Sequence, residues 1–199
     1  MAISAKDVKE LRQQTGAGMM DCKKALSQVG GDLGEAVKLL RTQGLAEAAK
    51  RSGRATTEGL IESYIHAGGK IGVLIEVGCE TDFVARNEDF QSFVHDLAMH
   101  VAAAAPRYVR REDVPGPEVE SEMAIYREQA KATGKPDNIL DKIASGKMEK
   151  YYQQVCLMEQ PFVKDDKMTI EQFLGELVSR IGENVDIKRF TRFELGRES

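Results

Sequence analysis

Nine residues, Cys79 to Asn87, separate two different patterns of apolar side chains. Before them, apolar residues alternate with a period of two, at Ile71, Val73, Ile75, Val77 and Cys79. After them, apolar residues recur every three or four positions, at Phe90, Phe93, Val94, Leu97, Ala98 and Val101. The first spacing is typical of a strand and the second of one helix face. The sequence therefore predicts that a strand ends and a helix begins within CETDFVARN, with Asn87 as the helix N-cap.

Phe83 is an aromatic residue in this otherwise polar segment. One interpretation is a staple, in which the ring packs under the following helix. The other is an exposed anchor for a binding partner, because an aromatic side chain framed by charges resembles a binding hot spot. The residues alone leave both interpretations open.

Length and charge limit the class of protein. The chain has 199 residues, of which 42% are apolar and 30% charged, which is typical of an ordinary globular protein with a real core. Its net charge is −4 and its pI is near 5.6. Such a charge argues against nucleic acid as a direct partner, since binding the phosphate backbone needs a concentrated positive face.

The cysteine and histidine residues show no pattern of a metal or disulfide site. Cys22, Cys79 and Cys156 are widely spaced in apolar stretches, so we expect reduced core thiols in a cytoplasmic protein. His95 and His100 lie beside the apolar stripe of the predicted helix, which favours exposure to solvent over metal binding. We expect no metal, no cofactor and no membrane span, and no nucleotide-binding or hydrolase motif occurs.

The first 54 residues predict a compact unit of three short helices followed by a linker. Ser4 and Asp32 are suitable N-caps for the first and third helices. Met19 and Met20 fall in the expected turn between the first two helices, where they suit either a core or an adaptable contact surface. The linker, residues 45–54, is basic at Lys50, Arg51 and Arg54, which favours a solvated face over contact with RNA.

The remaining residues predict an α+β core, residues 55–199. A β-hairpin is expected from residues 60–65 and 71–79 around Gly68-Gly69, followed by a helix from Phe90 to Ala105. An inserted helical hairpin is expected after Pro117, with its first helix ending at Gly134 and its second interrupted at Gly146. A last helix (170–181) and a last strand (185–195) then complete the small antiparallel sheet.

Two motifs, TGAGMMDCKKAL (15–26) and CETDFVARN (79–87), resemble the elongation factor Ts family. Further similar stretches follow in family order: LAMHVAAAAP (97–106), GKP (134–136), EQPFVKDD (159–166), IGEN (181–184) and RFTRFELG (189–196). The resemblance implies a ubiquitin-associated-like N-terminal domain on residues 1–54. It also implies a core and dimerisation domain on residues 55–199. The single lobe is similar to the family's short form.

The resemblance also implies a function, that of guanine-nucleotide exchange factor for elongation factor Tu, and no enzyme activity. The expected partner is Tu in both its GDP-bound and its nucleotide-free states. The segment Thr81, Asp82, Phe83 and Val84 is then expected to displace the partner's magnesium ion. Met19, Met20 and His100 are expected to bind the partner. Because a factor that prefers the nucleotide-free partner must weaken GDP by the same ratio, GDP release and exchange for GTP follow.

The open edge of a single lobe's sheet further predicts a homodimer. Thr191 stands where some short family members have a cysteine, so we expect the dimer to be non-covalent.

Two other functions remain open on the residues. A hydrolase would need Glu80, Asp82 and His95 to converge in a pocket. An adaptor would use only the N-terminal helices to bind a ubiquitin-like partner, which leaves the TDFV segment unexplained.

Overall fold

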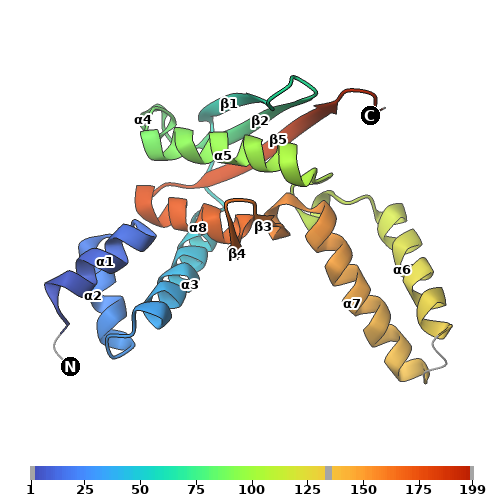
Figure 1. The fold of residues 1–199 in the computed structure, drawn as a ribbon, viewed down its shortest axis with the longest axis horizontal. Coiled ribbons are helices and arrows are strands. Elements are labelled where there is room, and N and C mark those ends of the chain that lie inside the picture. The colour runs from blue at the N-terminus through green and yellow to red at the C-terminus, as the bar shows by residue number, and fades with distance from the viewer. Residues whose placement is uncertain (1–2, 133–135, 198–199) are drawn as a thin grey trace. The chain divides into compact units, whose positions relative to one another are not determined.

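A computed structural model describes residues 3–132 and 136–197 of the chain (Figure 1). The chain divides into two compact units, and each is described by itself. The first is formed by the chain up to Met99 together with the segment from Glu171 onward, and the second by residues 100–170. The described residues contain helices and small antiparallel sheets, which confirms the predicted α+β class.

The first unit contains a three-stranded antiparallel sheet. Its strands are β1 (Glu58–Ile65), β2 (Ile71–Cys79) and β5 (Val185–Glu194), in the order β1-β2-β5. The turn between β1 and β2 contains Gly68 and Gly69, with φ angles of 91° and 68°. Both the hairpin and the late strand that joins it were predicted from the alternating apolar residues, and both predictions are confirmed.

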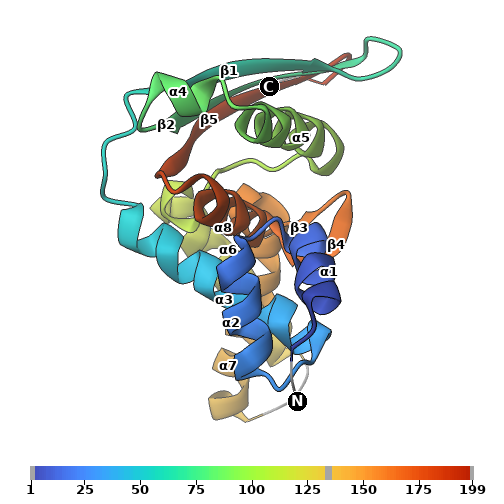
Figure 2. The same ribbon diagram turned by 90° about the vertical axis from the view of Figure 1, so that its left-hand side faces the viewer.

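The two faces of this sheet differ. Val73, Ile75 and Val77 are buried on the face that α5 (Glu88–Ala104) crosses (Figures 1 and 2). The opposite face carries exposed apolar side chains: Ile61, Ile65, Leu74 and Phe193. The register places Ile65 and Phe193 in one row across Gly72, whereas Leu74 stands opposite Ser63 and Thr191.

Three helices precede the sheet: α1 (Ala5–Thr15), α2 (Met19–Gln28) and α3 (Leu33–Arg51). Ser4 and Asp32 cap α1 and α3 as predicted, with side-chain oxygens that accept backbone N–H groups. Their shared core consists of six buried residues, Val8, Leu11, Cys22, Ala25, Leu26 and Ala36. One placement was wrong, because Met19 and Met20 lie in the first turn of α2 and not in the turn before it.

Helix α3 packs against α8 (Ile170–Ile181) at a close crossing. Gly44 is buried there, and a Cβ atom added to it would lie 3.0 Å from the carbonyl oxygen of Gly175. Arg41 and Glu176 form an ion pair of 3.1 Å beside this crossing. The two glycines let the helix backbones approach, and the ion pair fixes their register. The predicted division of the chain into residues 1–54 and 55–199 stays a prediction.

The second unit contains a helical hairpin, α6 (Gly116–Lys131) and α7 (Asp137–Val155), and a small β-hairpin. The β-hairpin pairs β3 (Pro161–Phe162) with β4 (Asp165–Thr169) and was not predicted. Pro117 lies in the first turn of α6 as predicted. The predicted interruption at Gly146 was wrong, because an exposed glycine costs a helix only about 1 kcal/mol and α7 continues through it. The helix end predicted at Gly134 lies outside the described residues.

Three further expectations concern the cysteines, membrane spans and metal sites. Cys22, Cys79 and Cys156 are free and buried, which confirms that they are core thiols. Among residues 3–132 and 136–197, no helix combines the length and apolar character needed to cross a membrane. Within the same residues, no cluster of His, Cys, Asp and Glu side chains is arranged to hold a metal ion.

The glycine crossing predicts opposite effects for two substitutions. Gly44→Val should lower the free energy of unfolding by about 1–3 kcal/mol, because the new side chain would meet the backbone of α8. Gly146→Ala should raise it by about 1 kcal/mol, since that helical position has open space around it. Denaturant titration of both variants checks this, and an unchanged Gly44→Val variant would contradict the close crossing.

Candidate functional site

The segment between β2 and α5 folds into a short helix, α4 (Asp82–Ala85). Sequence analysis predicted a bridge here but not this helical turn. Thr81 is its N-cap, and the Thr81 hydroxyl accepts a hydrogen bond of 3.3 Å from the backbone N–H of Val84. Asn87 caps α5 as predicted, because its side-chain oxygen accepts from the N–H of Asp89 at 2.8 Å. The two N-caps therefore fix the segment from Thr81 to Asn87, which we call the corner.

Glu183, beyond the end of α8, anchors the first residue of this corner. Its carboxylate accepts hydrogen bonds from the Thr81 backbone N–H at 3.1 Å and from the Thr81 hydroxyl at 2.7 Å. The Cys79 thiol donates to the carbonyl of Thr81 at 3.2 Å. Burial raises the pKa of Cys79 to about 11, so this thiol stays protonated near neutral pH and serves as a donor. The corner is therefore held from both its strand side and its helix side.

Phe83 points away from the protein. Its side chain is 82% exposed, whereas Val84 and Ala85 are only 5% and 8% exposed. The staple interpretation is therefore wrong, since the following two residues fill the space under α4. Asp82 is exposed too and pairs with Arg86 at 2.7 Å on the surface of the same turn. The result is an aromatic ring displayed on a turn whose other side is buried.

The three groups of the hydrolase alternative do not converge. Glu80 accepts the backbone N–H of Asn184 at 2.6 Å and pairs with Arg54 at 3.2 Å. The Asn184 N–H, followed by Arg54, holds the pKa of Glu80 below its usual value. Asp82 faces solvent beside Arg86, and His95 instead faces Glu62 at 3.5 Å. Glu80 therefore serves to join β2 to the segment before β5, and these three side chains do not form an acid–base site together.

Met19 and Met20, which are 59% and 62% exposed, form an exposed apolar patch that we call the methionine patch. They border a cleft of about 560 Å³ whose remaining lining residues come from α1, α2 and the segment before α1: Ile3, Ala5, Val8, Lys9, Arg12 and Lys23. Its floor is apolar and its rim is basic. The patch therefore has the composition of a surface that docks an apolar segment with acidic neighbours.

The basic residues of the linker are paired within the chain. Lys50 and Arg51 both pair with Glu47, at 2.9 Å each, and Arg54 pairs with Glu80. These pairs agree with the interpretation of the linker as a solvated, internally neutralised face.

His100 differs from its prediction. It was expected at the solvated side of α5, but its side chain is completely buried. The N–H of Val163 donates to Nδ1 at 3.3 Å, so Nε2 carries the proton that is shared with Gln160 at 3.0 Å. Burial lowers the pKa of His100 and keeps the ring neutral. His100 follows Phe93 and Leu97 at helical spacing, so the three residues share one face of α5. Because Phe93 and Leu97 are apolar, this spacing indicated that His100 is buried.

Sequence reasoning missed Glu183 as the anchor of the corner. It lies 102 residues from Thr81 along the chain, and no local pattern links the two. Their shared place in the fold follows only from the pairing of β5 with β2.

Comparisons with known proteins agree on one family. A family model described as "Elongation factor TS" matches residues 1–197. The elongation factor Ts of Geobacter sulfurreducens is 61% identical over 196 residues, which cover 98% of this chain and 91% of that protein. Those of Anaeromyxobacter dehalogenans and Desulforamulus reducens are 61% and 56% identical over 194 residues, covering 98% of this chain and 89% of each protein.

The Thr81 hydroxyl generates a prediction about the stability of the corner. Thr81→Val keeps the shape but removes both the cap and one bond to Glu183, so it should cost about 0.5–2 kcal/mol. Thr81→Ser keeps the hydroxyl and should cost less. Hydrogen exchange at the Val84 and Ala85 amides measures the local effect. Equal protection in the two variants would show that the hydroxyl does not hold α4.

Proposed function

The chain belongs to the elongation factor Ts family, and we propose on this basis that it is a guanine-nucleotide exchange factor for elongation factor Tu. It acts in translation elongation in the cytoplasm and breaks no covalent bond, so it is not an enzyme in the usual sense. The observation that carries the mechanism is the exposure of Phe83 on a turn that is capped by Thr81 and whose inner residues, Val84 and Ala85, are buried.

Exchange requires different affinities for two states of the partner. A factor that binds nucleotide-free Tu more tightly than GDP-bound Tu weakens GDP by the same ratio, because the two binding free energies are linked. A surface that binds both states equally would accelerate nothing. We propose that Phe83 acts as a wedge, that is, as a side chain inserted between elements of the partner. The wedge must therefore gain its contacts only when the magnesium and GDP site of the partner is disturbed.

Phe83 suits this role because it is already in position. A ring on a flexible loop would lose conformational entropy on binding, whereas the Thr81 and Asn87 caps hold this turn before the partner arrives. The ring enters between elements of the G domain and displaces the segment that organises the magnesium ion. Thr81 and Val84 hold the turn, while the charge of Asp82 opposes the return of phosphate.

Met19 and Met20 supply the second contact. Their exposed side chains and basic rim dock another patch of the G domain, through a ubiquitin-associated-like domain on residues 1–54. His100 contributes indirectly, because its buried ring holds the backbone of Val163, whose side chain is 46% exposed. The adaptor alternative explains the N-terminal helices but gives no role to Phe83.

The uncovered sheet face supports a non-covalent homodimer. Ile61, Leu74 and Phe193 are exposed on it, and several exposed apolar side chains on one face are typical of an interface.

We therefore expect light scattering to give twice the 22.0 kDa chain mass at micromolar concentration, without reducing agent affecting the result. Leu74→Lys should shift the chain to monomer, because each copy would bury an unpaired charge in the apolar interface. A wild-type monomer at that concentration would contradict the proposal.

The wedge predicts the effect of Phe83→Ala on exchange. Truncation of a hot-spot residue costs about 2 kcal/mol or more, so catalysed GDP release should slow by roughly 30-fold. The melting temperature should hardly change, because the ring is 82% exposed. Release of fluorescent GDP from Tu and thermal melting, measured on one preparation, test both parts.

Ile125→Ala is the matched control, since Ile125 is also an exposed apolar residue but lies on α6. It should exchange nucleotide at the wild-type rate. A Phe83→Ala variant with near-normal exchange would reject the wedge.

A further inference from the structure

Arg180, near the end of α8, lies directly against the backbone of Gly16. A Cβ atom added to Gly16 would lie only 2.5 Å from Nη2 and 2.6 Å from Cζ of Arg180. Gly16 caps the end of α1 with a left-handed φ of 67°. It begins the GAG turn that leads into Met19. The absence of a side chain here therefore lets the guanidinium reach the turn that carries the methionine patch.

The same guanidinium also pairs with the start of α5, the helix that follows Phe83. Its Nη1 atom pairs with Asp89 at 3.2 Å, and Asp89 is in the first turn of α5. Asp89 in turn donates its backbone N–H to the cap residue Asn87. One side chain thus contacts the turn before Met19 on one side and the helix start that follows Phe83 on the other.

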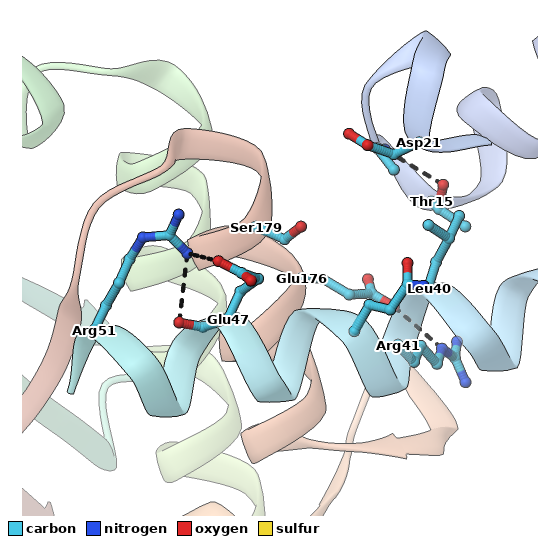
Figure 3. A pocket seen from close by; sticks show the side chains of 10 residues that line it. Thr15, Asp21, Leu40, Arg41, Glu47, Arg51, Glu176 and Ser179 are labelled. Carbon is cyan, nitrogen blue, oxygen red and sulfur yellow. Dashed lines mark hydrogen bonds and ion pairs between the residues drawn. The ribbon is translucent and has the colours of Figure 1, made fainter. Parts of the chain in front are cut away.

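A cleft lies between the N-terminal helices and α8, so the contact of Arg180 with Gly16 matters for the placement of these helices. It has a volume of about 460 Å³ and is lined by residues of α1, α2, α3 and α8. Figure 3 shows Thr15 and Asp21 at one end of the cleft and Glu47 and Arg51 at the other. The cleft therefore separates these parts of α1 and α2 from Glu176 and Ser179 of α8. Where side chains do not fill the space, a single bridging side chain has more influence on orientation.

We propose that Arg180 is a positioning residue for nucleotide exchange, which holds the Met19–Met20 patch and Phe83 at a fixed separation. This inference rests on the proposed function, in which both patches contact Tu at once. When one patch is bound, a fixed geometry raises the effective concentration of the other. Arg180 and Asp89 are 35% and 49% exposed, so their pair adds little to the stability of the fold. Its role is in the relative placement of two binding patches.

Kinetics of Arg180→Ala test the proposal. The concentration of the factor that gives half-maximal GDP release should rise about tenfold, because the two patches bind less cooperatively. The maximal rate should stay within about twofold of wild type, since Phe83 is intact. Arg127→Ala is the matched control, because Arg127 also forms an exposed ion pair, with Asp141, but on the helical hairpin. A half-maximal concentration equal to that of the control would overturn the proposal.

A distance measurement on the free chain tests the same idea without Tu. Spin labels at Lys24→Cys and Glu88→Cys report the separation of α2 from the start of α5, and the three native thiols are buried. Arg180→Ala should broaden the distance distribution, and Asp89→Asn should broaden it less because the Gly16 contact remains. An unchanged distribution in Arg180→Ala would overturn the proposal.

The two measurements separate this inference from the proposed function. If Phe83→Ala exchanges normally, the wedge fails whatever the spin labels report. If Phe83→Ala is slow but Arg180→Ala matches its control, the wedge stands and the positioning role of Arg180 is rejected.

Discussion

The display of Phe83 depends on the hydrogen bonds between Thr81 and Glu183. An exposed aromatic ring contributes little to its own position, so neighbouring residues must hold it. The carboxylate of Glu183 fixes both the N–H and the hydroxyl of Thr81, and that hydroxyl caps the turn on which Phe83 lies. Val84 and Ala85 are buried on the other side of this turn. The chain therefore displays an apolar group at its surface without exposing its own core.

Helix α8 connects this corner to the rest of the first unit. Gly175 contacts α3, while Phe173 lies 4.7 Å from Phe93 of α5, measured between ring centroids. Arg180 contacts the N-terminal turn and α5 together. Several faces of one helix thus join segments that are far apart in the sequence. Arg180, and Glu183 just beyond the end of α8, thus contact segments next to the two patches proposed to bind Tu.

Periodicity predicted most elements of this fold because each buries one face. It could not decide whether Phe83 was buried, since that depends on whether Val84 and Ala85 fill the space below the turn. The anchor Glu183 was equally hidden, because its contact with Thr81 spans 102 residues. The strand β3, Pro161–Phe162, is too short to show a period. His100 was misplaced although its spacing from Leu97 indicated the buried face.

We propose that Phe83 contacts Tu only when the nucleotide site is open. A photoreactive phenylalanine analogue at position 83 tests this most directly. Irradiation should cross-link the chain to nucleotide-free Tu, and the yield should fall when GDP and magnesium are added. Equal cross-linking to the two states, or none while exchange proceeds at the normal rate, would contradict the account.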